Sequence, residues 1–183
     1  AYLYGTLEDL ADARLMKGMT EAVELLRQKI RVGATIRIIG DYDIDGVNAT
    51  HILVTGLRRV GAQVDTVIPD RLKDGYGINE HLIEQAKEAG IDTIVTCDNG
   101  IAAAKEIAYA KELGMTVIVT DHHEIPYREE ADGTRTTILP PADVIVNPKQ
   151  ADCPYPYKKL CGAAVAWRLV EVLYQEAGVP REE

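Results

Sequence analysis

Residues 35–46 read TIRIIGDYDIDG, a run of β-branched residues followed by a glycine and three alternating aspartates. A nearly continuous series of Ile and Thr is typical of a strand that is buried on both faces of a sheet. Asp41, Asp43 and Asp45 follow directly, where the chain would leave the sheet. The stretch therefore predicts a buried strand at residues 35–39 whose carboxyl end carries a cluster of negative charge.

Four further β-rich segments predict the rest of the sheet, at residues 63–68, 93–96, 116–120 and 143–146. Helical segments separate the first four strands, at about residues 47–59, 79–89 and 102–113. Glycines follow these helices where a C-cap glycine belongs, at Gly61, Gly90 and Gly114. Strands that alternate with helices at this spacing predict an α/β protein with a mainly parallel sheet of about five strands in three α/β/α layers.

The two ends of the chain are predicted to be helical. Residues 1–31 form an N-terminal helical extension that packs on the sheet domain, and Thr20 is a candidate cap for its second helix. A final helix is expected at about residues 162–175, after a polar surface excursion at 124–142. We expect residues 1–183 to form a single domain, because this length suits one sizeable core.

Composition excludes several classes of protein. The apolar runs are far shorter than the roughly 20 residues that span a bilayer, and the first residues lack the basic start and apolar block of a signal peptide, so a cytoplasmic location is expected. Three cysteines without CxxC spacing argue against a disulfide framework and against a structural zinc site. The chain contains no serine, which excludes a serine nucleophile.

The formal net charge of -9 limits how the chain can meet nucleic acid. Affinity for phosphates comes mostly from Lys and Arg, so an acidic domain does not grip nucleic acid by itself. The same charge suits a domain that holds divalent cations. A nucleic-acid substrate would require cations, a local basic strip or another domain to neutralise its phosphates.

Further acidic and imidazole residues follow the later strands. Asp98 comes just after the third predicted strand, and Asp121, His122 and His123 come just after the fourth. The carboxyl ends of parallel strands share one edge of an open sheet, where ligands bind. Carboxylates brought together repel one another, and divalent cations with neutral imidazole ligands relieve that repulsion. The joint pattern predicts a metal site.

Each part of this pattern has a plainer interpretation. Asp98 could simply cap the next helix, and His122 and His123 could be surface histidines. The D-x-D-x-D-G run also matches the first half of an EF-hand loop, but Ile52 stands where the bidentate Glu of that loop belongs and a strand precedes the run. We therefore reject a calcium loop, and expect Gly46 to permit a tight strand-to-helix turn or close approach to phosphate.

With these motifs in order, the chain resembles the DHH phosphoesterase family, which is named for the Asp-His-His triplet at residues 121–123. Other segments are similar to the family's single-strand-specific exonucleases, and the resemblance covers essentially the whole chain. These segments lie at residues 4–7, 69–71, 75–77, 97–101, 147–149, 152–154 and 160–163.

The resemblance implies roles for the clustered residues. Asp43, Asp45, Asp98 and His122 match the family's metal ligands, and Asp98 matches the ligand that bridges two ions. Asp41 matches the first aspartate of the motif, which ligates or orients. The expected cofactors are Mn²⁺ or Mg²⁺, and all of these residues are candidate catalytic residues.

The resemblance also implies how substrate is bound. His123 matches the second histidine of the triplet, which faces the substrate phosphate and is also a candidate catalytic residue. Arg71, Lys73 and Tyr76, in the loop after the second predicted strand, are candidates to contact a nucleic-acid backbone or stack on a base. For Arg71 and Lys73, ordinary solvated loop residues are an equal alternative.

The implied activity is metal-dependent hydrolysis of phosphodiesters in single-stranded DNA, as in a 5′-to-3′ exonuclease core of DNA repair and recombination. Single-stranded DNA and other repair proteins are the expected partners. The family's fourth-motif aspartate and its C-terminal domain have no match in residues 1–183, and the chain starts at Ala1. We therefore expect a piece of a longer protein with an incomplete second metal shell and weak activity alone; removal of an initiator Met is the plain alternative for Ala1.

Three alternatives remain open. The first is another DHH enzyme that acts on nano-RNA, cyclic dinucleotides or pyrophosphate, and the second is a non-catalytic scaffold with the same fold. The third is a Rossmann-like nucleotide-binding protein, although no G-x-G-x-x-G follows the first strand.

Overall fold

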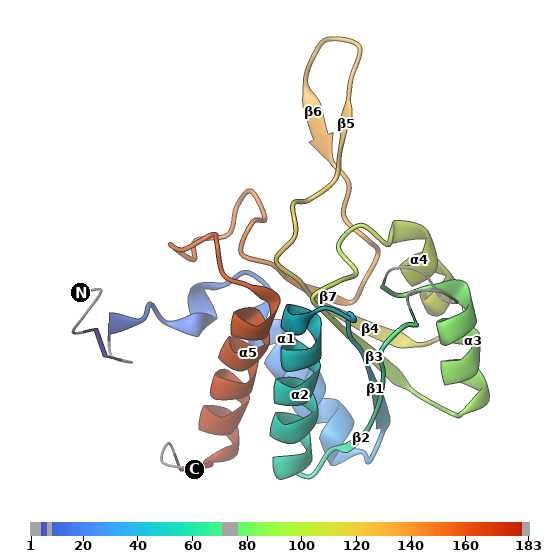
Figure 1. The fold of residues 1–183 in the computed structure, drawn as a ribbon, viewed down its shortest axis with the longest axis vertical. Coiled ribbons are helices and arrows are strands. Elements are labelled where there is room, and N and C mark those ends of the chain that lie inside the picture. The colour runs from blue at the N-terminus through green and yellow to red at the C-terminus, as the bar shows by residue number, and fades with distance from the viewer. Residues whose placement is uncertain (1–4, 7–8, 71–76, 181–183) are drawn as a thin grey trace.

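The β-branched segments form one sheet in the computed structural model, which describes residues 5–6, 9–70 and 77–180 (Figure 1). Within these residues the sheet has five strands in the order β2-β1-β3-β4-β7, and every neighbouring pair is parallel. The bounds are β1 Thr35–Ile39, β2 Gln63–Val67, β3 Thr93–Cys97, β4 Thr116–Thr120 and β7 Val144–Val146. The predicted fold class is confirmed.

Helices cover both faces of this sheet (Figure 1). One face carries α1 (Met19–Arg31), α2 (Ile44–Arg59) and α5 (Gly162–Ala177), and the other carries α3 (Glu80–Glu88) and α4 (Ala104–Glu112). Successive residues of β4 alternate between the two cores: Ile118 packs with the first set of helices, and Val117 and Val119 pack with the second. None of the described helices is both long and apolar enough to cross a membrane.

The path of the chain places a topological switch point beside β1. From β1 the chain runs to β2 on one side, and it later returns to place β3 on the other side. Ile39 of β1 pairs with Thr96 of β3, and Cys97 pairs with Thr120 of β4, so the three strands end at neighbouring positions. Ligands of open α/β sheets bind beyond the carboxyl ends of the strands at such a point.

The glycines that follow the helices have the conformation expected of helix C-termini. Gly61, Gly90 and Gly114 have φ values of 86°, 71° and 77°, just after α2, α3 and α4. Glycine adopts this left-handed conformation without the steric cost that a β-carbon brings. The C-cap prediction is confirmed at all three positions.

The start of α1 differs from the prediction. A short 3-10 helix, Ala13–Leu15, precedes it, and Gly18 rather than Thr20 is the N-cap residue. Gly18 has a φ of 82°, and a β-carbon there would lie 2.2 Å from the carbonyl oxygen of Ile145 in β7. The tertiary contact with the sheet therefore decides where α1 begins, and the prediction of Thr20 as a cap is wrong.

The segment that precedes α1 is tied to α5. The guanidinium of Arg14 donates to the side chains of Gln175 at 2.6 Å and Glu176 at 2.8 Å. Arg168, which is buried, donates to the backbone carbonyl of Ala11. Contacts between the two ends of the described chain thus hold the N-terminal segment against the helical layer.

The polar excursion after β4 contains a hairpin that the sequence did not predict. Strands β5 (Tyr127–Glu129) and β6 (Arg135–Thr137) pair antiparallel and project away from the domain (Figure 1). All of their residues are exposed, so the alternating apolar pattern that marks a half-buried strand is missing. The guanidinium of Arg135 lies 4.4 Å from the centre of the Tyr127 ring, which links the strands across the hairpin.

The contact between α2 and α5 depends on Gly56. A β-carbon at Gly56 would lie 2.5 Å from a methyl group of Val170 in α5. Alanine in place of a helical glycine usually stabilises by about 0.5–1 kcal/mol. Here we expect Gly56→Ala to lower the free energy of unfolding by about 1–3 kcal/mol, because the added methyl overpacks the interface.

Urea denaturation measures this effect. Val170→Ala provides room for the methyl group, so adding Gly56→Ala to a Val170→Ala background should cost little or be favourable. A stabilised Gly56→Ala single variant would contradict the packing argument.

Candidate metal centre

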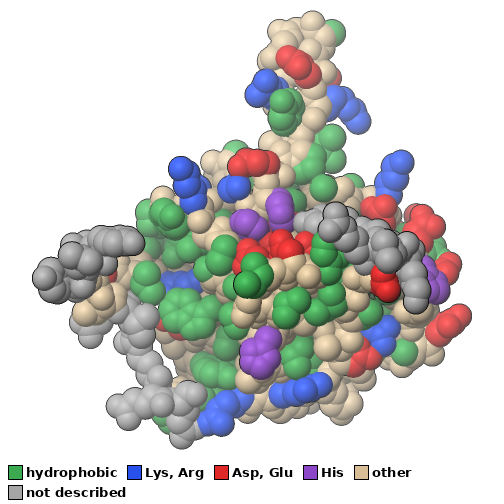
Figure 2. Space-filling view, viewed as in Figure 1, with side chains coloured by type: hydrophobic (Ala, Val, Ile, Leu, Met, Phe, Trp, Pro, Cys, Tyr) green, Lys and Arg blue, Asp and Glu red, His purple; other side chains and the backbone are tan. Residues whose placement is uncertain are grey.

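Acidic and imidazole side chains meet beyond the carboxyl ends of β1, β3 and β4. Figure 2 shows such side chains gathered near the base of the β5–β6 hairpin. Two overlapping groups of three residues each have ligand atoms that lie within 4.8 Å of one another. Asp45 adjoins them, because its Oδ2 lies 3.6 Å from Nε2 of His122. The groups are Asp41, Asp43 and Asp98, and Asp98, His122 and His123. The fold thus brings together six of the seven side chains that the sequence singled out after these strands, and the seventh, Asp121, contacts His123.

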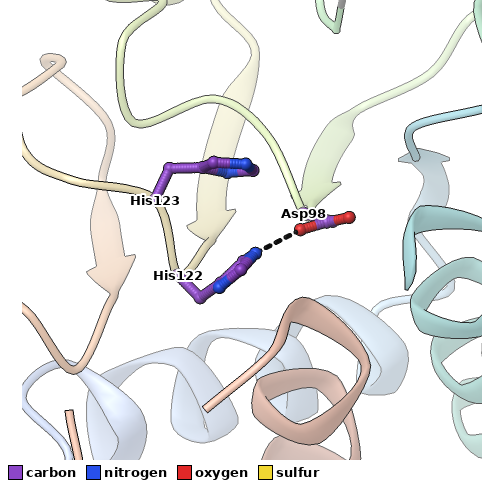
Figure 3. Close-up of side chains that lie close together, drawn as sticks. All are labelled: Asp98, His122 and His123. Carbon is purple, nitrogen blue, oxygen red and sulfur yellow. Dashed lines mark ion pairs between the residues drawn. The ribbon is translucent and has the colours of Figure 1, made fainter. Parts of the chain in front are cut away.

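Asp98 lies at the centre of this arrangement, because it belongs to both groups. Its Oδ1 lies 3.0 Å from Nε2 of His122 (Figure 3). The residue is 1% exposed and has a φ of 60°, a left-handed conformation that is rare for a residue with a side chain. The N-cap of α4 is Ala103, so the interpretation that Asp98 merely caps the following helix is wrong.

The crowding of carboxylates changes their acidity. Burial, followed by the charges of Asp45 and Asp43, raises the pKa of Asp98 to about 7. Burial also raises the pKa of Asp41, and the charge of Asp43 adds to this shift. Such a cluster of oxygen donors with a neighbouring imidazole fits a divalent cation, which would stabilise the ionised carboxylates.

Asp45 connects the cluster to α5. Its two carboxylate oxygens accept hydrogen bonds from the backbone N–H groups of Gly162 at 2.7 Å and Ala163 at 2.8 Å. These donors belong to the first turn of α5, where no intrahelical acceptor is available for them. Asp45 is therefore held in place by a helix N-terminus that begins more than a hundred residues later in the chain.

Gly162 forms one wall of the centre. A β-carbon at this position would lie 2.5 Å from Oδ1 of Asp98. Sequence reasoning placed Gly162 in a family-like segment but assigned it no role. The available signal was a glycine in the first turn of a helix, directly before a run of apolar residues.

The turn that follows β1 orients the first two aspartates. Oδ1 of Asp43 accepts a hydrogen bond from the N–H of Gly46 at 2.8 Å and caps α2, and Oδ1 of Asp41 accepts from the N–H of Tyr42. A β-carbon at Gly46 would lie 2.5 Å from the β-carbon of Asp41. Gly46 thus has the expected role in a tight strand-to-helix turn.

Asp121 positions His123. It is 1% exposed, and its carboxylate accepts from the N–H groups of Ile101, His122 and His123 and contacts Nδ1 of His123 at 2.7 Å. Burial acts to raise the pKa of Asp121, but these hydrogen bonds outweigh it and the pKa is lowered. The hydrogen bond with Asp121 in turn raises the pKa of His123. Sequence reasoning counted Asp121 in the cluster but did not foresee this positioning role.

Three candidate substrate contacts lie outside the described residues. Arg71, Lys73 and Tyr76 fall between residues 70 and 77, so the predicted contacts remain predictions. His123, the fourth candidate, has a side chain that is 45% exposed beside the centre.

The order of motifs around this centre defines a class of protein. Residues 35–183 match the family model described as "DHH family, N-terminal domain". This range contains every residue of the cluster. The chain therefore belongs to the DHH family, and the resemblance inferred from its motifs is confirmed.

Within this family the chain is similar to exonucleases named RecJ. The chain is 45% identical over 175 residues to the single-stranded-DNA-specific exonuclease RecJ of Bacillus subtilis and 38% identical over 159 residues to that of Escherichia coli. These matches cover 96% and 86% of the chain. They cover 21% and 26% of the two relatives, so the chain spans about a quarter of their length.

Solved structures of RecJ have the same fold and hold the expected metal. A structure of exonuclease RecJ bound to manganese matches with a TM-score of 0.76 and 39% identity, over 90% of this chain and 39% of that one. RecJ of Thermus thermophilus in complex with Mn²⁺ matches with a TM-score of 0.68 and 35% identity, over 90% and 22%. A Mg²⁺ complex of the T. thermophilus protein matches as well. The expectation of Mn²⁺ or Mg²⁺ agrees with these neighbours and with the donor set.

Gly162 offers a direct test of the centre's packing. We expect Gly162→Ala to weaken Mn²⁺ binding about ten-fold or more, because the new methyl group would displace Asp98, and misplaced ligand orientation typically costs about 10–100-fold in affinity. Titration calorimetry of the chain with Mn²⁺ measures this. Ala164→Gly, in the same turn of α5, controls for helix propensity and should retain wild-type affinity. Equal affinity in Gly162→Ala would contradict the steric argument.

The raised pKa of Asp98 predicts a pH dependence of stability in the metal-free protein. The folded protein holds a proton on Asp98 up to about pH 7, whereas the ordinary pKa of an aspartate is 3.8. The folded state therefore binds more protons between these values, and this residue's contribution to stability falls as pH rises from about 4 to 7.

Asp98→Asn removes this penalty without changing the shape of the side chain. In the presence of EDTA we expect Asp98→Asn to be more stable than the wild type at pH 8, by on the order of a few kcal/mol, and the difference to vanish near pH 4. Urea denaturation at several pH values measures it. A difference that is constant with pH would refute the assignment.

Proposed function

We propose that the chain is the metal-binding core of a two-metal phosphodiesterase that degrades single-stranded DNA. The observation that carries the proposal is that Asp98, at the switch point of the sheet, groups with Asp41 and Asp43 on one side and with His122, 3.0 Å away, on the other. A carboxylate shared between two groups suits a ligand that bridges two ions. The relatives named as single-stranded-DNA-specific exonucleases support the choice of substrate.

In this proposal Asp43, Asp45, Asp98 and His122 hold Mn²⁺ or Mg²⁺, and Asp41 ligates or orients. When bound, the ions supply Lewis-acid chemistry that polarises the phosphate and activates water for in-line attack. The chain's own contribution is to fix these ligands in place before the ions arrive. Asp43 is held as the N-cap of α2, and Asp45 is held by two backbone N–H groups in the first turn of α5.

His123 acts on the substrate rather than on the ions. Asp121 holds Nδ1 of the imidazole and raises its pKa, which favours the protonated ring. The protonated ring directs Nε2 as a donor to a phosphate oxygen and offsets negative charge on it. Asp121 is a positioning residue in this scheme.

The substrate strand is expected to meet the loop that contains Arg71 and Tyr76, where a cation and an aromatic ring suit a sugar–phosphate backbone and a base. We further propose that residues 1–183 act as one unit, and that the protein works in the cytoplasm with other proteins of DNA repair and recombination.

Metal binding provides the first test of this proposal. Asp98→Ala and His122→Ala should each weaken Mn²⁺ binding by about ten-fold or more in calorimetry, because each removes a ligand atom. His51→Ala is the matched control, since His51 is an exposed histidine of α2 outside the cluster. Wild-type affinity in Asp98→Ala would refute the metal centre.

Substrate choice needs a second experiment. The chain would replace the matching segment of the B. subtilis relative, and the chimaera would be assayed with Mn²⁺ on 5′-phosphorylated single-stranded DNA, on duplex DNA and on dinucleotides. We expect digestion of the single strand, and its loss in the Asp98→Ala chimaera. Preference for dinucleotides would instead favour the alternative DHH phosphoesterases.

A further inference from the structure

A cavity of about 550 Å³ adjoins the candidate metal centre. His123 and Asp121 form part of its wall, and the rest comes from residues 99–103, the first turn of α4 and the chain at Ile78. The proposed metal ligands Asp43, Asp98 and His122 are not among the described residues that line it. The cavity is therefore a neighbour of the metal centre, and His123 is the residue that the two share.

The cavity is lined mainly by apolar residues, and two glutamates lie among them. Ala102 and Ala103 supply apolar surface beside the buried Ile78 and Ile101, and Glu106 and Glu124 also belong to the lining. Apolar walls suit the flat face of an aromatic ring, whereas two carboxylates repel a phosphate.

The two carboxylates are not equivalent. Oε1 of Glu124 lies 2.8 Å from Nζ of Lys149, which offsets its charge. Among the described residues, the carboxylate of Glu106, in the first turn of α4, has no hydrogen-bond or ion-pair partner. Glu106 is therefore the better acceptor for N–H groups of a ligand in the cavity.

The floor of the cavity is built rigidly. The side-chain amide of Asn99 donates to the carbonyl oxygens of Ile39 at 3.0 Å and Cys97 at 2.9 Å, and its Oδ1 accepts from the N–H of Ile78 at 3.3 Å. These bonds join the ends of β1 and β3 to the segment that precedes α3. A cavity with a preformed floor binds a ligand without the entropic cost of ordering it.

We propose that this cavity binds the base of the nucleotide whose phosphate lies at the metal centre, an inference that rests on the proposed function. The base lies against Ala102 and Ala103, and the carboxylate of Glu106 accepts a hydrogen bond from it. Every nucleobase carries at least one N–H donor on its Watson–Crick edge, so this contact requires a base without selecting a sequence. The phosphate remains on the His123 side, away from the two glutamates.

Nuclear magnetic resonance of the whole chain in EDTA tests the pocket without requiring catalysis. We expect deoxyguanosine monophosphate to shift the backbone amide signals of Ile101, Ala102 and Ala103, and 2-deoxyribose 5-phosphate to leave them unchanged. Base stacking is typically strong enough that losing it weakens binding about ten-fold. Equal shifts with the abasic sugar phosphate, or with inorganic phosphate, would overturn the proposal in favour of a phosphate site.

Two variants sharpen the test. Ala102→Phe fills the cavity from an exposed position, and Glu106→Gln removes the acceptor charge while retaining its shape. Each should weaken binding of deoxyguanosine monophosphate about ten-fold and leave the thermal melting temperature near that of the wild type, and unchanged binding in both variants would overturn the proposal. Glu112→Gln, in the last turn of α4 and outside the cavity, is the matched control and should bind normally.

The results of the binding experiments and of the chimaera assay distinguish a failure of the base pocket from a failure of the proposed hydrolase. Base-dependent shifts without Mn²⁺ binding would support the pocket and refute the hydrolase. Mn²⁺-dependent digestion in the chimaera without base-dependent shifts would refute the pocket and leave the hydrolase intact.

Discussion

The carboxylate of Asp98 lies buried among other carboxylates where three parallel strands end, and its pKa is raised to about 7. Burying this much like charge is costly, so the surrounding structure must either neutralise it or supply compensating partners. His122 supplies one partner at 3.0 Å, and divalent cations would supply the rest. Much of the architecture around the sheet edge can be understood as a response to this crowding.

Two helix N-termini provide the main compensation within the protein. Asp43 caps α2, and Asp45 accepts hydrogen bonds from the first turn of α5, so both carboxylates face the positive end of a helix. These hydrogen bonds also fix the direction of each side chain. The aspartates are thus oriented by the protein itself, which is what a metal centre requires if its ligands are to be preorganised.

Small residues allow these groups to come so close. Gly46 lets the turn after β1 fold against Asp41, and Gly162 lets α5 approach Asp98. A buried polar network on the other side holds His123 through Asp121 and builds the floor of the neighbouring cavity through Asn99. The metal centre and the cavity therefore share one rigid framework, which would place a phosphate and its base in a defined relation.

Local sequence was enough to predict much of this protein. The bounds of β1 and β4 agree with the prediction, because runs of Ile, Val and Thr bounded by Gly or Asp carry a strong local signal. The meeting of Asp41, Asp98 and His122 was also predictable, because parallel strands deliver their carboxyl ends to one edge whatever the details of packing.

The tertiary structure alone decided the contacts that orient these groups. Asp45 and Gly162 are separated by 117 positions, and nothing in either local sequence indicates that a carboxylate of one segment caps the helix of the other. Gly18 likewise owes its role to a close approach to Ile145, and the β5–β6 hairpin lacks a buried face that would mark its strands. Sequence patterns record which face of an element is buried, but the partner that a polar group meets depends on how distant elements pack.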